Sequence, residues 1–141
     1  MRVSEVMSRN VQMVHSDQPV RDATRMMAEL NAGFLPVCDG GNKMVGIVTD
    51  RDIALRVVSA GKYPDTLVRD VMTRNVRYCF EDAELTDAAK DMANHKLRRL
   101  AVLNRDNRLV GVITLGDLAR HEIDAAAVAV TGVSVPGGPN C

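Results

Sequence analysis

Aromatic side chains are scarce in this sequence of 141 residues, which has no Trp, two Tyr and two Phe. Large aromatic rings therefore cannot dominate its hydrophobic core, as they do in many domains. Apolar residues nevertheless make up 46% of the chain, and eight of them are methionines. A core of aliphatic side chains and methionine is expected.

An excess of charge of either sign is also lacking. The 18 basic and 18 acidic side chains give a formal net charge of zero. Because nucleic-acid binding depends first on neutralising phosphates, this balance argues against a nucleic acid as the main partner. The three cysteines, Cys38, Cys79 and Cys141, are too few and too widely spaced for a C-x-x-C metal site or a disulfide framework. We expect free thiols in a reducing cytoplasm.

Long apolar runs are missing as well. No stretch approaches the ~18 apolar residues of a membrane span, and residues 1–5 do not lead into an apolar signal-peptide core. A cytoplasmic protein without a membrane partner is expected. The length favours one compact domain, or two very small ones that share a core, over an enzyme with separate cofactor and substrate lobes.

The chain does contain an internal repeat. At a shift of 65 residues, residues 6–11 match residues 71–76, residues 45–49 match residues 110–114, and Asp52 matches Asp117. Two copies of a unit this long indicate gene duplication rather than a solenoid, which needs more and shorter repeats. The predicted organisation is a first repeat at 1–60, a linker at 61–65, a second repeat at 66–123, and a partly disordered tail at 124–141.

Each repeat shows the pattern strand, helix, strand, strand, helix. In the first copy we expect strands at 11–14, 34–38 and 44–49, with a hairpin turn at 39–42. A helix capped by Asp17 or Gln18, with Pro19 in its first turn, should bury one face. That face consists of Val20, Ala23, Met27 and Leu30, and Leu85, Ala88 and Met92 repeat it. The fold class is α/β (α+β): two tandem β-α-β-β-α repeats packed about a pseudo-two-fold axis.

The pattern Gly-x-x-Thr-x-x-Asp occurs once in each repeat, at residues 46–52 and 111–117. Each threonine ends a predicted buried strand, and each aspartate lies in the first turn of the next helix. A carboxylate there could accept hydrogen bonds from ribose hydroxyls, and the glycine would let a ring approach. The same spacing is also typical of a capping box that only stabilises the helix start. The two interpretations are compatible.

The duplicated unit resembles the CBS (cystathionine-β-synthase) domain, and the pair resembles a stand-alone Bateman module over residues 3 to about 121. The resemblance rests on Val-Met-Ser/Thr-x-x-Val at Val6 and Val71, on residues 33–37, and on both Gly-x-x-Thr-x-x-Asp patterns. It implies that AMP, ADP, ATP, NAD or S-adenosylmethionine binds in a cleft between the repeats as a regulatory ligand, with no cofactor required. It also implies that Asp52 and Asp117 hold ribose hydroxyls and that Thr49 and Thr114 contact ribose or phosphate.

The second repeat departs from the family pattern at two places. Leu100-Ala101-Val102 replaces the usual Leu-Pro-Val, and Lys96, Arg98 and Arg99 stand where the first copy has Asn31, Gly33 and Phe34. These cations could neutralise a phosphate chain, or they could form a solvated basic edge. The difference predicts one phosphate-competent site rather than two equal ones.

The resulting hypothesis is a non-enzymatic sensor of an adenine nucleotide that signals by a change of conformation or of partner affinity. The alternative is a ligand-free structural or protein-interaction module. No catalytic or metal-binding set is recognisable, because His15, His95 and His121 are scattered. A homodimer is expected, since Ile53, Val57 and Val58 exceed what one small core can bury and family members usually pair through such helices.

Overall fold

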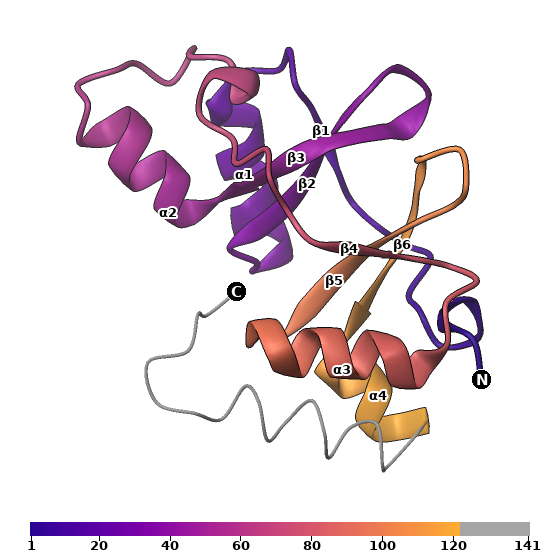
Figure 1. The fold of residues 1–141 in the computed structure, drawn as a ribbon. Coiled ribbons are helices and arrows are strands. Elements are labelled where there is room, and N and C mark those ends of the chain that lie inside the picture. Colours follow the sequence, from indigo (N-terminus) through magenta and orange to yellow (C-terminus); the bar gives the residue numbers. More distant parts are fainter. Residues whose placement is uncertain (122–141) are drawn as a thin grey trace. The chain divides into compact units, whose positions relative to one another are not determined.

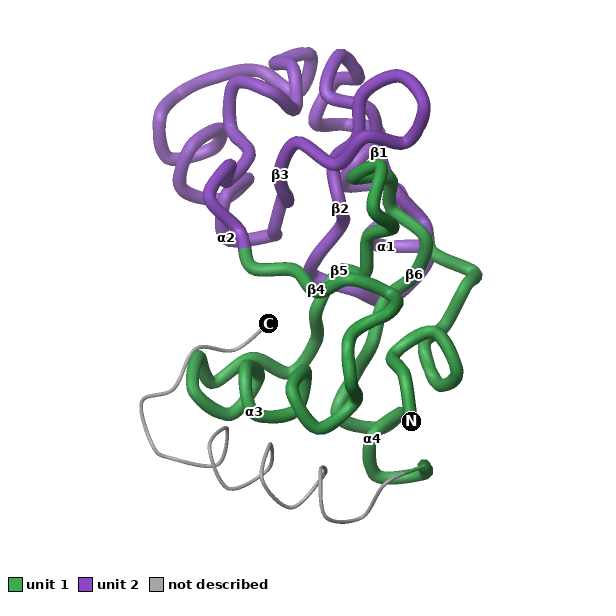
Figure 2. Tube along the Cα trace, turned by 45° about the vertical axis from the view of Figure 1, so that its right-hand side comes forward, with its two compact units in different colours: residues 1–11, 77–141 green, residues 12–76 purple. Residues whose placement is uncertain are grey.

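The computed structural model of the chain describes residues 1–121. Two compact units make up the chain, shown in different colours in Figure 2. Unit 2 is the continuous segment Gln12–Val76, whereas unit 1 combines Met1–Val11 with Arg77–Cys141. The predicted tail at 124–141 lies outside the described residues, as do Cys141 and the predicted disorder.

Unit 2 contains a three-stranded sheet in the order β1-β2-β3. β1 pairs parallel with β2, and β2 pairs antiparallel with β3 across a short 3-10 turn, η2. Figure 1 labels its strands and α-helices. Its elements are β1 (Val14–His15), α1 (Val20–Leu30), β2 (Phe34–Asp39), η2 (Gly40–Asn42), β3 (Lys43–Thr49), α2 (Asp50–Ile53), the π-helical segment η3 (Ala54–Val58) and η4 (Val68–Asp70). The strand predicted at 11–14 was wrong in its bounds, because β1 is Val14–His15 and overlaps the prediction only at Val14.

Unit 1 repeats this architecture with a sheet in the order β4-β5-β6. Its elements are η1 (Val3–Glu5), β4 (Tyr78–Phe80), α3 (Leu85–His95), β5 (Arg99–Leu103), β6 (Leu109–Thr114) and α4 (Leu115–His121). The parallel and antiparallel pairings follow the same pattern as in unit 2. The predicted fold class, a mixed α/β chain built from two β-α-β-β-α repeats, is confirmed. None of the helices within residues 1–121 combines the length and apolar character that crossing a membrane requires.

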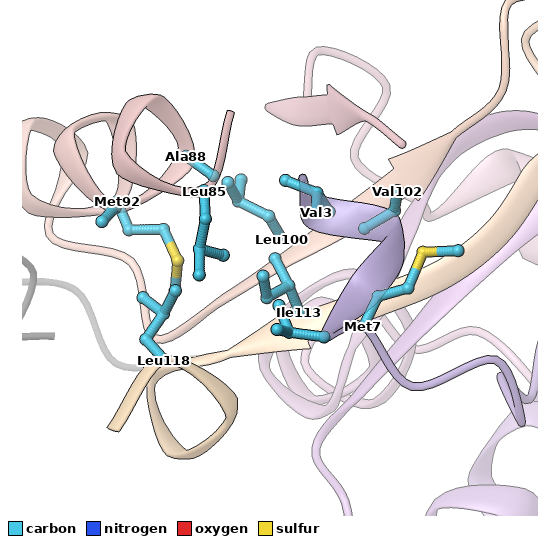
Figure 3. Packing of buried hydrophobic residues seen from close by; sticks show 11 residues of the cluster. Val3, Met7, Leu85, Ala88, Met92, Leu100, Val102, Ile113 and Leu118 are labelled. Carbon is cyan, nitrogen blue, oxygen red and sulfur yellow. The ribbon is translucent and has the colours of Figure 1, made fainter. Parts of the chain in front are cut away.

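The N-terminal segment completes the core of unit 1. Val3 and Leu100, at 0% and 1% exposure, lie in one apolar cluster, and the side chains from η1, α3, β5, β6 and α4 point toward one another in Figure 3. In unit 2 the corresponding place is taken by Val68, Val71 and Met72, which belong to the second repeat in sequence order. Each core therefore includes a Val-Met segment from before the other sheet in the sequence. Residues 3–7 precede the sheet of unit 2 but pack in unit 1, and residues 68–72 precede the sheet of unit 1 but pack in unit 2.

The buried faces of the two long helices largely confirm the pattern analysis. Val20, Ala23 and Met27 of α1 are buried, and so are Leu85, Ala88 and Met92 of α3. Leu30 was wrongly placed on the buried face, because α1 ends there with Asn31 in the left-handed conformation, and Leu30 is 45% exposed.

The start of α1 also differs from the prediction. Its N-cap is Pro19, and neither Asp17 nor Gln18 caps it with a side chain. The first helical N–H groups need acceptors, and backbone carbonyls supply them: Val20 N–H donates to Thr66 O (2.8 Å) and Arg21 N–H to Pro64 O (3.1 Å). A distant segment of the chain thus replaces the side-chain cap that local sequence suggested.

Candidate functional site

The predicted Thr49 and Asp52 meet at the start of α2. Thr49 N–H donates to Asp52 Oδ2 (3.0 Å), and Asp52 N–H donates to Thr49 Oγ1 (3.1 Å). This reciprocal pair is a capping box, with aspartate in place of the more common glutamate. The capping interpretation is therefore correct, and it fixes a carboxylate of only 8% exposure at the positive end of the helix.

A third residue, Thr73, joins this carboxylate. Its hydroxyl donates to Asp52 at 3.2 Å from Oδ1 and 3.3 Å from Oδ2, and the Arg56 guanidinium lies 3.9 Å from Oδ1. Thr73 is positioned by two backbone hydrogen bonds with Ile47 in β3 (2.8 and 2.9 Å). Thr73 was not predicted as a site residue, although it belongs to the Val-Met-Ser/Thr match at residues 71–73.

Unit 1 builds the same box at the start of α4. Thr114 N–H donates to Asp117 Oδ2 (2.9 Å), and Asp117 N–H donates to Thr114 Oγ1 (3.2 Å). The Arg120 guanidinium hydrogen-bonds Asp117 Oδ1 from a side chain that is 64% exposed. An ionised carboxylate offers about four acceptor positions, so each aspartate can accept further hydrogen bonds. The arginine beside each carboxylate, Arg56 or Arg120, has a largely exposed side chain.

The structure brings two of the three predicted basic residues to this box. Arg99 is the register partner of Thr114 between β5 and β6, and the Arg98 carbonyl accepts a hydrogen bond from Leu115 N–H (3.1 Å). Lys96 lies two residues earlier, at the C-cap of α3 with φ 55°. With Arg120, whose guanidinium contacts Asp117, three arginines have their backbone positions near the start of α4. In unit 2 the corresponding pairings involve uncharged residues, Gly33 and Phe34.

The glycine of each pattern serves a different purpose from the one expected. A Cβ added to Gly46 would lie 2.5 Å from the Thr73 carbonyl oxygen, and one on Gly111 would lie 2.7 Å from the carbonyl oxygen of Ser8. Real Cβ atoms do not come this close to backbone oxygens. The expectation that these glycines leave room for a ligand ring is wrong, because the backbone of the Val-Met segment fills that space.

A pocket of about 390 Å³ opens beside the start of α2, between the C-terminal end of α1 and Ile53. Its polar groups include Asn31 and Asp50, and Met27 is part of its apolar lining. Neither Thr49 nor Asp52 lines it. It is a neighbour of the capping box rather than the space in front of its carboxylate.

Two cysteines lie within the described residues, and both are free thiols. Burial, helped by the nearby Asp39, raises the pKa of Cys38 to about 11. Burial and the charge of Asp91 raise the pKa of Cys79 to about 12. Both thiols are protonated at neutral pH and are poor nucleophiles. Within residues 1–121 no three His, Cys, Asp or Glu side chains cluster as metal ligands.

The sequence profile of the CBS domain matches the chain twice, at residues 3–59 and 68–124. A CBS domain-containing protein of Bacillus subtilis, YhcV, is 36% identical over 134 residues, which cover 94% of each chain. The two matches follow the internal repeat found in the sequence.

Solved structures agree with this assignment. CBSX2 of Arabidopsis thaliana, solved in complex with AMP, is 29% identical with a TM-score of 0.73, covering 87% of this chain and 96% of its own. The CBS domain pair of protein MJ0100, in complex with 5′-methylthioadenosine and S-adenosylmethionine, is 28% identical with a TM-score of 0.70, covering 85% and 94%. With two profile matches that span most of its length, this chain belongs to the CBS domain family and contains a pair of its repeats.

Proposed function

We propose that this protein is a regulatory module that binds an adenine-containing nucleotide at the capping boxes of its two repeats. The observation that carries the proposal is the duplicated arrangement at the start of α2 and α4. In both places a nearly buried aspartate is fixed by a threonine N–H and keeps acceptor capacity. Relatives of similar length were solved with AMP and with S-adenosylmethionine, both of which contain the adenosine that such a carboxylate could hold.

In this proposal Asp52 and Asp117 accept hydrogen bonds from the ribose hydroxyls. The capping bonds hold each carboxylate in place before the ligand arrives, so binding loses little side-chain entropy. Thr49 and Thr114 contact the ribose or the first phosphate from the same helix start, whose N-terminal dipole favours an anion. Capping and ligand binding thus use different lone pairs of the same oxygen atoms.

Phosphate selectivity is assigned to unit 1. Arg99 pairs with Thr114, the Arg98 carbonyl accepts a hydrogen bond from Leu115 N–H, and Lys96 lies two residues before Arg98. We propose that these cations bind phosphate groups, with arginine acting by bidentate contacts. Unit 2 has Gly33 and Phe34 at the places of Arg98 and Arg99, and is proposed to favour a ligand with fewer charges.

A thermal-shift screen with AMP, ADP, ATP, NAD and S-adenosylmethionine tests the proposal. A ligand that binds only the folded protein at 100 times its dissociation constant adds about 2.7 kcal/mol to the free energy of unfolding, so the melting temperature must rise. Adenosine serves as the control without phosphate. In Arg98→Ala, the shift with adenosine should persist while the shift with ATP falls. If none of these ligands shifts the wild-type protein at millimolar concentration, the alternative of a ligand-free interaction module replaces the proposal.

No catalytic role is proposed, and a reducing cytoplasm remains the proposed compartment, in keeping with the free thiols Cys38 and Cys79. The signal would pass to a partner, or to a second copy of the chain, through a ligand-dependent change of affinity.

We also propose a homodimer, which keeps only Val58 of the three residues first considered. Val57 is buried in unit 2 at 3% exposure, and Ile53 is partly buried against the same core. Leu55 and Val58 are instead 51% and 72% exposed on η3. Light scattering should give twice the monomer mass for the wild type. A monomer mass at high micromolar concentration would rule the dimer out, and the double variant Leu55→Ser/Val58→Ser should lower the mass if this surface is the interface.

A further inference from the structure

The turn that follows the first strand of each unit is built in the same way. Three backbone hydrogen bonds recur at the shift of 65 residues. In unit 2 they are Gln18 N–His15 O (3.1 Å), Ser16 N–Cys38 O (3.2 Å) and Arg69 N–Ser16 O (2.9 Å). Their counterparts in unit 1, in the same order, are Ala83 N–Phe80 O (3.1 Å), Glu81 N–Leu103 O (2.9 Å) and Ser4 N–Glu81 O (2.9 Å). Side chains at matching positions of the two turns therefore start from the same backbone frame.

In unit 1 this turn holds a guanidinium group. Arg105, from the loop between β5 and β6, donates two hydrogen bonds to Asp82, from Nε to Oδ2 and from Nη2 to Oδ1, both 2.9 Å long. Its guanidinium carbon also lies 4.0 Å from the centroid of the Phe80 ring. A bidentate carboxylate on one side and a ring face on another are the two contacts that a planar guanidinium makes best. We call this arrangement the guanidinium socket.

In unit 2 the same socket lacks its arginine. The position of Arg105 is occupied by Gly40, while Asp17 stands at the position of Asp82 and His15 at that of Phe80. These three residues line a pocket of about 360 Å³. A Cβ added to Gly40 would meet no atom within 4 Å, so the space above it is open. The carboxylate and the aromatic ring are both kept, and only the group that would lie between them is absent.

The pocket also contains two cations. Arg69 and Arg74 line it, and Arg74 Nη2 donates to the Arg69 carbonyl (3.3 Å). Arg74 matches Arg9 of unit 1, which makes the same kind of bond to Ser4, so it belongs to the shared frame. Arg69 is different, because the residue at its place in unit 1 is Ser4. The unit whose socket is open has thus gained a cation beside it.

Asp39 also lines the pocket, and its carboxylate accepts a hydrogen bond from the Ser16 hydroxyl. Ser16 is only 9% exposed. The Asp39 carboxylate is therefore already paired with Ser16. The other acid in the pocket is Asp17, whose matching residue in unit 1, Asp82, binds the Arg105 guanidinium. A ligand that fits both walls carries a guanidinium for Asp17 and His15 and a carboxylate for Arg69.

We propose that this pocket binds a guanidinium compound that also bears a carboxylate, namely free arginine or the C-terminal arginine of a peptide. The guanidinium lies between the His15 ring and the Asp17 carboxylate, as Arg105 does between Phe80 and Asp82. The carboxylate pairs with Arg69. None of the residues at the capping boxes takes part, so the site is separate from the proposed nucleotide function.

The test is an amide chemical-shift titration of the wild-type protein with L-arginine. Saturable shifts are expected at residues 15–17 and 39–41, with affinity reduced at least ten-fold for agmatine, which lacks the carboxylate, and for citrulline, which lacks the charge. A peptide ending in arginine distinguishes a protein C-terminus from free arginine as the ligand. Tighter binding of this peptide than of L-arginine identifies a protein terminus, and tighter binding of L-arginine identifies the amino acid. The C-terminal amide of the same peptide is the control, because it lacks the carboxylate and should bind more weakly.

Matched variants make the test specific. Gly40→Arg should fill the socket with its own guanidinium and abolish the titration, while Gly40→Ala should leave it unchanged. Arg105→Gly should open the equivalent socket of unit 1 and add shifts at residues 80–82 with weaker affinity, because Ser4 there replaces Arg69. The proposal is overturned if wild type and a folded Gly40→Arg variant titrate alike, if citrulline binds as well as arginine, or if neither arginine nor the peptide gives saturable shifts.

Discussion

Replacing Val3 by aspartate is expected to unfold unit 1. Val3 is completely buried in the cluster shown in Figure 3, although it lies only two residues from the N-terminus. An unpaired carboxylate in an apolar core is among the few changes that cost more than about 4 kcal/mol. Because whole domains are stable by only about 5 to 15 kcal/mol, the loss should approach the total stability of the unit.

Urea unfolding followed by residue-resolved hydrogen exchange measures this effect. Protection should be lost at residues 77–121 at a lower urea concentration than at residues 12–76, because Val68 and Val71 fill the core of unit 2 without Val3. The control is Arg2→Asp, which introduces the same carboxylate at an exposed neighbouring position and should change stability by less than about 1 kcal/mol. If the two variants were equally stable, the N-terminal segment would not be part of this core.

Substituting alanine for Gly46 is expected to destabilise unit 2 by about 1 to 3 kcal/mol, the usual cost of overpacking. The new Cβ would lie 2.5 Å from the Thr73 carbonyl oxygen and 3.2 Å from Met72 Sδ. The sulfur can move, but the carbonyl is held in a backbone pair with Ile47. For a unit of this size the melting temperature should fall by roughly 4 to 8 °C per kcal/mol.

Gly111→Ala should behave in the same way, because its Cβ would lie 2.7 Å from both Met7 Sδ and the Ser8 carbonyl oxygen. Gly40→Ala is the control, since a Cβ there meets nothing within 4 Å. Circular dichroism melts of the three variants compare the effects. If Gly46→Ala and Gly111→Ala kept full stability and only lost nucleotide affinity, the glycines would serve ligand approach, as the sequence first suggested.

Much of the fold could be predicted from the sequence because the repeat shows the apolar pattern of each strand and helix twice, in two different stretches of sequence. The strand predicted at 44–49 lies within β3 (Lys43–Thr49), and the turn predicted at 39–42 joins β2 to β3. The capping boxes were also predictable, because a Thr-x-x-Asp contact spans only three residues. Local spacing determines such contacts without knowledge of the rest of the chain.

Contacts between distant segments could not be predicted in this way. Nothing in the local pattern indicates that Thr73 reaches Asp52, or that Val3 packs with Leu85. The start of α1 shows the same limit: Asp17 is a good capping residue, but carbonyls from residues 64–66 already satisfy the helix N–H groups. The difference between Arg105 and Gly40 is visible in the aligned repeats. Its consequence, a filled socket in unit 1 and an open one in unit 2, depends on how each residue lies against the turn that follows the first strand.

Calorimetric titration of AMP into the wild type, Asp52→Ala and Asp117→Ala tests the central claim most directly. A lost carboxylate leaves the ribose hydroxyls without acceptors, so each variant should weaken binding at its own site by about 1.5 to 3 kcal/mol, or ~10- to 150-fold. Loss of the cap alone lowers stability by about 0.5 to 2 kcal/mol, so the titrations are compared per folded molecule. The account predicts saturable wild-type binding that each substitution weakens. Unchanged dissociation constants in both folded variants would contradict it and would leave Asp52 and Asp117 as helix caps alone.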